Sequence, residues 1–514
     1  MSAIRISPQP ETPIIIGSLT TAMNQLLFHL DPQLPASLQK QLREQVARAI
    51  LDGHIPMDKA LPSSRKLAQE LGIARNTVML VYEQLLDSGY LLAKSRSGYF
   101  VNPEILKGHA ARPERLNDID AEQLAWEELL TMRPSQQRTI NKPNDWSCYE
   151  YPFLYGQIDP ELFPTPQWRE CSRDSMSVPA IRSWAVDHLN DDDPLLIKQI
   201  RTRLLPRRGV WAAPEEILVT VGAQQALWLV SMLLLKKGRR FGMENPGYVD
   251  MFNIASTFTD DILLLPVDAQ GMRPDMQIST CDLTYVTPSH QSPTTVTMPL
   301  DRRRALLDLA EQDNFLVIED DYESETNYLE NPTPALKSLD KHQRVIYVGS
   351  LSKTLAPGLR VGYMVGPPAL IREARALRRL MLRHPPTNNQ RAVALFLDRG
   401  YHDALLRQIH RVYHRRWRCM GEALAIHMPH ASTPSIYGGS SFWIKGPPGM
   451  DCRLLQELAR EHGILIERGD LHFFDEPYSE YFRLGFSAIA EARIAAGIEK
   501  LARLVAQAVI IDTP

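Results

Sequence analysis

The fold of this chain is decided by residues 345–360, which read VIYVGSLSKTLAPGLR. The apolar start predicts a buried strand that delivers Lys353, a lysine flanked by hydroxyl side chains. A partly deprotonated lysine amine can form a Schiff base with an aldehyde. Ser350, Ser352 and Arg360 are residue types that bind phosphate, the arginine through its planar fork. A surface lysine after an edge strand is the alternative interpretation.

Two earlier turns carry residue types that suit a planar, phosphorylated molecule. Residues 217–226, ILVTVGAQQA, form an apolar strand that turns at a glycine into a helix. The free N–H groups and the dipole of a helix start attract anions, so Gly222, Ala223 and Gln224 are predicted to hold a phosphate. The next turn, ENPGY, places Tyr248 where its ring could stack on a planar group. Both turns could also serve packing alone.

A third strand ends in acidic residues at 315–322, which read FLVIEDDY. Functional residues of α/β sheets lie at the carboxyl ends of strands. Asp320 could there hold the N–H of a pyridinium ring, with Asp321 as the alternative. Tyr322, two residues on, would face the same way on an extended chain and reach a ring hydroxyl. A solvated acidic loop and a metal site are the other interpretations, but no histidine cluster accompanies the acids and we predict no metal ligand.

Together these motifs supply the four contacts that pyridoxal 5'-phosphate needs: a phosphate cup, a stacking ring, an acid for the pyridine nitrogen and a lysine for the aldehyde. The set resembles the fold-type-I aminotransferase domain, and the resemblance covers residues 151–505. It implies an α/β fold with a mainly parallel sheet, pyridoxal 5'-phosphate as the cofactor, and a homodimer with the site at the subunit interface. Strands that alternate with helices from about Tyr151 onward favour the same fold class.

Two further segments compare with these enzymes. Residues 481–487, YFRLGFS, resemble the segment whose arginine holds a substrate carboxylate. Arg483 is therefore the predicted effector-carboxylate residue, and an ion pair at a strand edge is the competing interpretation. Residues 287–295, TPSHQSPTT, occupy the place of the usual Asn-Pro-Thr-Gly, with Ser292 for the asparagine and Thr295 for the glycine. This departure argues against efficient transamination.

The composition is that of a globular protein with more than one domain. The chain has 514 residues, 44% apolar and 23% charged, and 57 basic against 60 acidic residues give a net charge of -3. These values exclude a disordered or collagen-like chain and a uniformly basic nucleic-acid coat. Five scattered cysteines without a CxxC pair indicate a reducing cytoplasm. The longest apolar run is far shorter than the ~20 residues of a membrane span, and no signal peptide is evident, so we expect no membrane partner.

Residues 36–102 form a separate block with its own helix and turn signals. Apolar spacing and turn residues predict three helices and a hairpin, over residues 37–51, 65–71, 74–86 and 90–101. This order, with a basic hairpin tip, is typical of a winged helix-turn-helix. The block has nine basic and six acidic residues, hence +3, and the rest of the chain therefore carries -6. A small helical packing domain with solvated arginines is the alternative interpretation.

The second helix of the turn would enter the major groove by its N-terminal residues. The predicted DNA contacts come from the two helix starts and the wing: Ser63, Arg65, Arg75, Asn76, Thr77, Lys94 and Arg96. Ser63 is also a plausible N-cap of the helix that it precedes. Residues 61–78, LPSSRKLAQELGIARNTV, and residues 97–101, SGYFV, resemble the GntR-type winged helix. The resemblance implies binding to double-stranded operator DNA as a dimer.

The two halves in one chain resemble the MocR/GabR family of bacterial transcription regulators. We predict a GntR-type domain over 25–102, a linker over 103–150 with a helix near 121–130, and an aminotransferase-like domain over 151–505. The resemblance implies that a small amino compound forms an external aldimine at Lys353 and thereby changes DNA binding through the linker. It also implies a head-to-tail homodimer.

Two other functions fit the same residues. The first is an active aminotransferase with an accessory DNA-binding domain, against which the segment 287–295 argues. The second is a winged-helix regulator whose large domain binds no cofactor, against which the joint presence of Lys353, Asp320, Tyr322 and Arg360 argues.

Overall fold

The computed structural model describes residues 28–106 and 125–509, apart from residues 33, 35, 96, 188, 328–332, 432–437 and 477. The chain divides into two compact units between Thr131 and Met132. We call them the small unit and the large unit.

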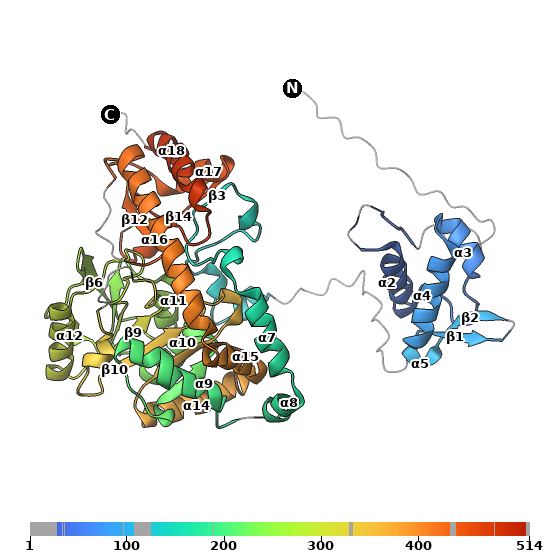
Figure 1. Ribbon diagram of the computed structural model, residues 1–514, viewed down its shortest axis with the longest axis horizontal. Helices are drawn as coiled ribbons and strands as arrows, with labels where there is room; N and C mark the ends of the chain where they lie inside the picture. The colour runs from blue at the N-terminus through green and yellow to red at the C-terminus, as the bar shows by residue number, and fades with distance from the viewer. Residues whose placement is uncertain are drawn as a thin grey trace. The chain divides into compact units, whose positions relative to one another are not determined.

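The described part of the small unit is built around three longer helices and a two-stranded antiparallel hairpin, drawn in blue in Figure 1. Its elements are α2 (Leu38–Leu51), α3 (Ser64–Leu71), α4 (Arg75–Asp87), β1 (Leu91–Lys94), β2 (Gly98–Val101), and the short helices α5 (Pro103–Leu106) and α6 (Trp126–Leu129). The three predicted helices and the predicted hairpin are therefore confirmed. Residues 121–124 of the helix predicted in the linker lie outside the described residues, and α6 occupies the rest of that prediction.

Local sequence explains where these helices begin and end. Ser63 caps α3, because its hydroxyl oxygen accepts a hydrogen bond from the N–H of Lys66 at 3.3 Å. Gly72 ends the helix in the left-handed conformation, at φ 65°. Tyr82 of α4 is fully buried and donates its hydroxyl to the Pro62 carbonyl at 2.8 Å, which fixes the two helices of the turn against each other.

The large unit is built on an eight-stranded sheet with the order β4-β11-β10-β9-β8-β5-β6-β7. Its strands are β4 (Ile217–Thr220), β5 (Phe241–Asn245), β6 (Ile262–Asp268), β7 (Gly271–Met272), β8 (Leu283–Val286), β9 (Leu316–Asp321), β10 (Val345–Ser350) and β11 (Gly362–Val365). The five central strands, from β10 to β6, run parallel, and β11 is antiparallel to both its neighbours. This arrangement confirms the predicted α/β fold with a mainly parallel sheet.

Helices cover both faces of this sheet, because its buried strands are apolar on both sides. One face packs on α10 (Gly222–Leu234), α11 (Val249–Phe258) and α14 (Pro368–Leu382). The other packs on α12 (Leu300–Gln312) and α15 (Thr387–Asp398). The remaining helices of this part are α7 (Thr165–Ser175), α8 (Val178–Trp184), α9 (Pro194–Gln199) and α13 (Leu336–Leu339).

A second, smaller sheet lies toward the C-terminal end, coloured orange to red in Figure 1. Its antiparallel strands follow the order β12 (Ser441–Lys445), β15 (Tyr481–Gly485) and β14 (Glu467–Arg468). A separate parallel pair joins β13 (Ile464–Leu465) to β3 (Tyr151–Pro152). Helices α16 (Tyr401–His427), α17 (Cys452–Glu461) and α18 (Glu491–Gln507) pack around these strands. The register of β14 on β15 places Glu467 opposite Arg483, which matters for the site below.

The second half of the segment predicted as a linker is part of the large unit. Arg138 donates to the carbonyl of Phe473, and its own carbonyl accepts from Asn253 Nδ2 at 2.7 Å. Further along, Lys142 donates to the carbonyl of Tyr155. Residues 137–142 are thus fixed at several points to the body that carries the site.

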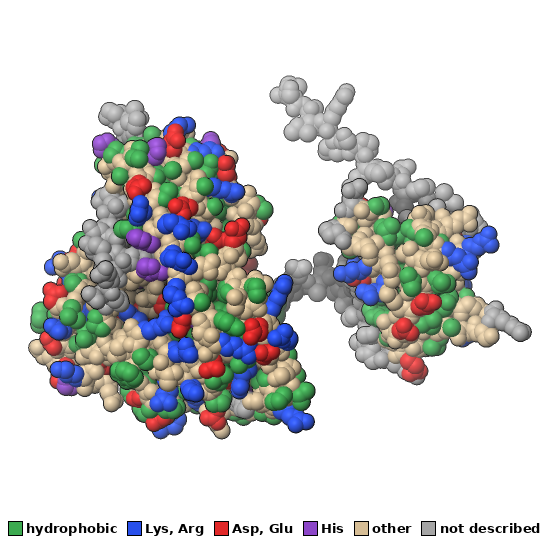
Figure 2. Space-filling model, viewed as in Figure 1, with side chains coloured by type: hydrophobic (Ala, Val, Ile, Leu, Met, Phe, Trp, Pro, Cys, Tyr) green, Lys and Arg blue, Asp and Glu red, His purple; other side chains and the backbone are tan. Residues whose placement is uncertain are grey.

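None of the helices that the structure describes combines the length and the apolar character that a membrane span requires. No cluster of three or more His, Cys, Asp or Glu suited to a metal ion occurs among the described residues either. Figure 2 shows basic and acidic side chains interspersed over the faces in view, with a run of basic and histidine side chains over α16.

Candidate functional site

A cavity of about 270 Å³ opens at the carboxyl end of the central strands. Ten of the predicted residues line it: Ala223, Gln224, Tyr248, Asp320, Tyr322, Ser350, Ser352, Lys353, Arg360 and Arg483. They come from the ends of β4, β5, β9 and β10 and from β15 of the smaller sheet. Carboxyl ends of parallel strands meet at one edge of a sheet, so this gathering follows from the topology.

The start of α10 is shaped for close approach of an arginine. Gly222 has φ +71°, and a Cβ there would lie 2.9 Å from Arg360 Nη2 and 3.0 Å from its Cζ. Arg360 itself holds an unusual positive φ of 50° and donates from Nη2 to the Val221 carbonyl at 3.3 Å. The guanidinium is thereby held against the N-terminus of a helix, where both groups attract an anion. Gly222 borders this end of the cavity without lining it.

Tyr248 stands at the start of α11, beside that helix end. Its hydroxyl lies 2.8 Å from Gln224 Oε1 and 3.2 Å from Asp250 Oδ2. These contacts fix the position of the ring at the cavity wall. Burial, and then the charge of Asp250, hold the pKa of Tyr248 well above its usual value, so the phenol stays neutral.

Asp320 lies at the end of β9 and is 4% exposed. Its Oδ2 accepts a hydrogen bond from Tyr285 Oη at 2.9 Å, while Oδ1 has no hydrogen-bond partner among the described residues. Burial raises the pKa of this carboxyl to about 7. A carboxylate with one oxygen fixed and the other open to the cavity is suited to accept from a ring N–H.

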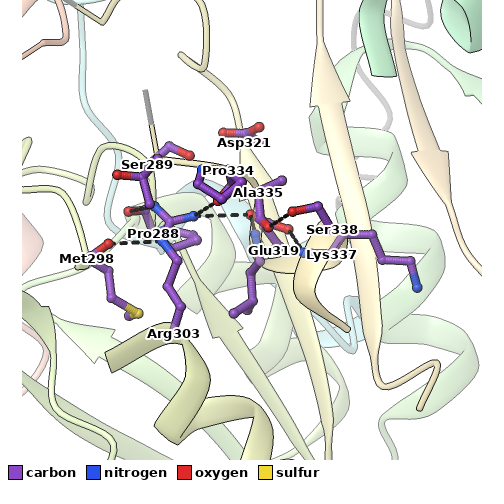
Figure 3. Close-up of polar contacts among 12 residues, drawn as sticks. Pro288, Ser289, Met298, Arg303, Glu319, Asp321, Pro334, Ala335, Lys337 and Ser338 are labelled. Carbon is purple, nitrogen blue, oxygen red and sulfur yellow. Dashed lines mark hydrogen bonds and ion pairs between the residues drawn. The ribbon is translucent and has the colours of Figure 1, made fainter. Parts of the chain in front are cut away.

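The two acids beside Asp320 face the opposite side of the strand, as the alternation of a strand requires. Asp321 is paired with Arg208 at 2.7 Å and accepts from Tyr347 Oη at 2.8 Å. Burial raises the pKa of its carboxyl, but the charge of Arg208 and the hydrogen bonds to the carboxylate together hold this pKa below its usual value. Glu319 accepts from the N–H groups of Leu336 and Lys337, beside the buried Arg303 at 4.0 Å (Figure 3). Asp321 therefore does not line the cavity, and Asp320 alone of the two candidates does.

Lys353 follows β10 and reaches the cavity beside an aromatic ring. Its Nζ lies 4.2 Å from the centroid of the Tyr155 ring. Burial, and then the charge of Lys142, lower the pKa of the Lys353 amine to about 8. A larger fraction of this amine is therefore neutral near pH 7 than of an ordinary lysine, as a Schiff-base lysine requires.

Arg483 is 1% exposed in the middle of β15. Its Nε donates to Ser441 Oγ at 2.9 Å, its Nη1 lies 3.5 Å from Glu467 Oε1, and its Cζ is 3.4 Å from the centroid of the Tyr155 ring. The predicted competitor, a strand ion pair, is thus present across the register, but the contact with Glu467 is long and Nη2 has no partner in the described part of the chain. That nitrogen leaves Arg483 able to bind a second anion.

Glu467 is held ionised. Burial alone raises the pKa of its carboxyl, but the hydrogen bond with His472 at 3.2 Å and the charges of Arg483 and Lys142 lower it to about 2. The side chain therefore carries a full negative charge at one wall of the cavity across the physiological range.

The segment that replaces Asn-Pro-Thr-Gly also reaches the cavity, through Ser292. The N–H of Ser292 donates to Thr287 Oγ1 at 2.9 Å, so the segment is fixed by its own hydrogen bonds. Thr295 has φ 62°, in the left-handed region that a β-branched residue rarely adopts. This is the position where the aminotransferase pattern has glycine, and the backbone keeps the conformation that glycine favours although the side chain has changed.

The lining residues that the sequence analysis did not predict include Lys142, Tyr155, Tyr285, Glu467 and His472. Each lies outside the four motifs and reaches the cavity by tertiary contact alone. Period-2 alternation puts Tyr285 on one face of β8, but nothing local distinguishes it from a core tyrosine. The pairing of Glu467 with Arg483 depends on the register of two strands that are 13 residues apart.

The predicted DNA contacts of the small unit lie on its surface at the helix starts and the wing. Arg75 and Asn76 are exposed in the first turn of α4, and no side chain caps that helix end. Arg65 is exposed on α3, and Ser63 is occupied as its cap. The Lys94 ammonium lies 4.4 Å from the centroid of the Phe100 ring on the hairpin.

Two of the predicted DNA contacts are not among these exposed residues. Thr77 is half-buried, and Arg96 lies outside the described residues. The backbone N–H groups at the exposed, uncapped start of α4 can donate hydrogen bonds to phosphate oxygens or to base edges.

The residues of the cavity fit pyridoxal 5'-phosphate. Asp320 Oδ1, Tyr322 Oη and Ser352 Oγ are buried polar atoms without a hydrogen-bond partner among the residues that the structure describes. Buried polar atoms are nearly always paired, so such a set is typical of groups that bind a ligand. An acid, a hydroxyl and a phosphate contact are the partners that the ring nitrogen, the ring hydroxyl and the phosphate of this cofactor need.

Comparison with known proteins gives the same division of the chain. The pattern of bacterial regulatory proteins of the gntR family matches residues 38–101, and that of aminotransferase class I and II matches residues 191–501. Pyrococcus horikoshii kynurenine aminotransferase, solved with PMP, superimposes with a TM-score of 0.66 and 27% identity over 76% of this chain and 99% of that one. The match to aminotransferase class I and II implies that pyridoxal 5'-phosphate is the cofactor of this fold.

Two curated relatives share both halves. The HTH-type transcriptional regulator TauR of Rhodobacter capsulatus is 42% identical over 478 residues, which cover 93% of this chain and 98% of that protein. The "Probable rhizopine catabolism regulatory protein MocR" of Rhizobium meliloti is 30% identical over 479 residues, 92% and 94% of the two chains. The molecule is thus a helix-turn-helix transcription regulator that carries an aminotransferase-type domain. The chain belongs to the MocR family of these regulators, as its sequence motifs predict.

Proposed function

We propose that this regulator senses a small amino compound at Lys353, with pyridoxal 5'-phosphate bound, and that the compound changes the affinity of the small unit for operator DNA. The observation that carries the proposal is the cavity in which Lys353, Asp320 and Arg483 meet. The same chain has an exposed recognition helix of the GntR type. Sensing and DNA binding are therefore assigned to separate units.

Different residues of the cavity are suited to bind different parts of the cofactor. When bound, pyridoxal 5'-phosphate supplies an aldehyde that bonds reversibly to amines and a ring that withdraws electrons. Arg360 and the start of α10 would hold its phosphate, Tyr248 would lie against its ring, and Asp320 would accept a hydrogen bond from the ring N–H. Tyr322 would contact the ring hydroxyl.

Lys353 keeps part of its amine neutral, because burial and Lys142 lower its pKa to about 8. Arg483 pairs with the carboxylate of the amino compound through Nη2, the nitrogen that has no partner among the described residues. We further propose that the chain acts as a head-to-tail homodimer on an operator with two half-sites, with domains over 25–102 and 151–505 and a linker between them.

An active aminotransferase is the competing function, and the complete set of cofactor contacts favours it. Ser292 opposes it, because its short side chain stands where these enzymes carry asparagine. A steady-state assay with an amino donor and a 2-oxo acid separates the two functions. We expect turnover no faster than the background reaction, whereas a sustained rate would assign the chain to the enzymes.

The visible absorbance spectrum of the purified protein tests the proposal most directly. We expect a yellow band in the wild type that is absent or shifted in Lys353→Ala, with Lys237→Ala on an exposed turn as the matched control. Circular dichroism of each variant shows whether the fold is retained. A wild type that stays colourless after addition of pyridoxal 5'-phosphate would refute the assignment of the cavity.

A further inference from the structure

Residues 137–142, which we call the strap, contribute to the lining of two cavities of the large unit. Thr139, Ile140 and Lys142 line the site cavity and also line a second cavity of about 110 Å³, and Glu467 lies between the two as well. The strap is fixed at both ends, by the Arg138 and Asn253 hydrogen bond and by the bond from Lys142 to the Tyr155 carbonyl. Between these two ends, Thr139 and Asn141 are exposed.

Three cations surround one aromatic ring at this wall. The distances to the centroid of Tyr155 are 4.2 Å from Lys353 Nζ, 5.5 Å from Lys142 Nζ and 3.4 Å from Arg483 Cζ. Burial, and the charge of Arg483, lower the pKa of Lys142, although the charge of Glu467 opposes this. The surroundings therefore destabilise the charged form of Lys142 as long as no further anion is bound.

The carboxylates that face these cations leave positive charge uncompensated. Glu467 is shared between Arg483 and His472, at 3.5 Å and 3.2 Å. Glu323 accepts from Ser440 Oγ, and burial raises the pKa of its carboxyl. Asp250 contacts the hydroxyl of Tyr248. Burying an excess of like charge is costly, so an anion bound between Lys142 and Arg483 would be stabilised.

Both cations have hydrogen-bonding capacity left for such an anion. An ammonium has three donors, and among the described residues Lys142 donates a hydrogen bond to the Tyr155 carbonyl alone. Arg483 has Nη2 without a partner among the described residues. The phosphate end of the cavity, at Gly222 and Arg360, is formed by other residues.

We propose that Lys142 is a second anion-binding residue of the effector site, which with Arg483 clamps the acidic group of the amino compound and so couples its binding to the strap. The inference rests on the proposed function and extends it in two ways. The effector is an amino compound with an acidic group. The strap reports its binding, because residue 132 begins the large unit and the chain continues from the strap toward the small unit.

The test uses the full chain loaded with pyridoxal 5'-phosphate. A series of ω-amino carboxylates from aminoacetate to 6-aminohexanoate is titrated against alkylamines of the same chain length, with visible absorbance as the readout. The variants are Lys142→Met, Lys142→Arg and, as a matched control on an exposed turn, Lys237→Met. Deuterium exchange of the peptide that contains the strap is measured with and without the amine that binds most tightly.

We expect the wild type and Lys237→Met to bind the best amino carboxylate at least about 10-fold more tightly than its alkylamine, since a hydrogen bond to a charged group is worth roughly 1.5–3 kcal/mol. Lys142→Met should lose most of this preference and keep its affinity for the alkylamine. Lys142→Arg should restore the preference. The amino carboxylate should slow exchange in the strap of the wild type and of Lys142→Arg, and leave that of Lys142→Met unchanged.

Three results would overturn the inference. The first is an acid preference in Lys142→Met equal to that of the wild type. The second is a wild type without any acid preference, including one that responds to neither series. The third is a strap whose exchange is the same with and without the bound amine. A protein that holds the cofactor and responds to amines independently of Lys142 leaves the proposed function intact, whereas one that never acquires a visible band contradicts both.

Discussion

Asp320 and Asp321 are adjacent in sequence, but their side chains lie on opposite sides of β9 and have different partners. Asp320 lines the cavity with one free oxygen, and Asp321 is buried in a charge pair with Arg208. We expect Asp320→Asn to weaken retention of the cofactor by at least about 10-fold, because an amide cannot provide the charge that a protonated ring nitrogen needs. Dialysis followed by the visible spectrum measures the retained fraction.

Asp321→Asn is the matched variant, and its expected effect is on folding. Removing one partner of a buried charge pair costs about 3–5 kcal/mol of unfolding free energy, since Arg208 would be left buried without its carboxylate. Chemical denaturation of the apoprotein measures this loss. If Asp320→Asn retains the cofactor as well as the wild type does, the contact with the ring nitrogen must be made by another residue.

Glu467 makes the stability of the large unit depend on pH. The pKa of its carboxyl is about 2 in the folded chain and 4.5 in an ordinary glutamate. Its stabilisation is therefore complete above about pH 4.5 and is lost as pH falls toward 2. The shift of about 2.5 units corresponds to about 3 kcal/mol, at 1.36 kcal/mol for each unit.

Glu467→Gln should accordingly lower the unfolding free energy by about 3 kcal/mol at pH 7 and by clearly less near pH 3. Urea denaturation at the two pH values measures the difference. Glu499→Gln, which alters an exposed pair with Arg503 on α18, is the control and should change stability by less than about 1 kcal/mol at either pH. A loss from Glu467→Gln that does not vary with pH would contradict an ionised Glu467.

At the scale of elements, the turn from β4 into α10 is the most constrained part of the site. A Cβ at Gly222 would lie 2.9 Å from Arg360 Nη2, and φ there is +71°. A Cβ at Gly362, the first residue of β11, would in turn lie 2.6 Å from the carbonyl carbon of Gly222. Gly222→Ala should therefore displace Arg360 and weaken cofactor retention by about 10-fold or more. Gly358→Ala, in the same region, meets nothing within 4 Å and should retain the cofactor as the wild type does. Dialysis with the visible spectrum distinguishes them, and equal retention would exclude a steric role for Gly222.

The elements also show what the sequence could predict. Strands that end in functional residues were recognisable because each motif is local, and parallel topology brings the strand ends together. The winged helix was recognisable because its caps and turns stand in a fixed order. Lys142, Tyr155 and Glu467 were not, because they reach the cavity through contacts between segments far apart in the chain, and no local period encodes such contacts.

The loop that carries Thr295 could be predicted from the sequence only in part. The sequence showed a departure from the aminotransferase pattern, and the structure shows that the positive φ of the lost glycine is kept. The surrounding buried hydrogen bonds, among them those of Gln291, hold the loop in this conformation. Local sequence reports such a conflict, but its outcome depends on the tertiary structure.

At the scale of the whole molecule, the proposed effector cavity and the GntR-type helix-turn-helix belong to separate units of one chain. An amino compound can change DNA affinity only by binding differently to the DNA-bound and free forms. The same coupling must act in reverse, so DNA must change the affinity for the compound by the same factor. This reciprocity applies to the full chain, whatever its oligomeric state.

We therefore expect the amino compound that shifts the visible spectrum most to change the Kd for operator DNA by about 5-fold to 150-fold, and DNA to change the Kd for the compound equally. Fluorescence anisotropy at fixed salt measures the first, and absorbance titration measures the second. Lys353→Ala should bind DNA like the wild type without responding to the compound. Arg75→Ala should bind DNA more weakly by ~1–3 kcal/mol and still bind the compound normally, since Arg75 lies on α4 of the small unit. A response to the compound that survives in Lys353→Ala would place the sensor outside this cavity.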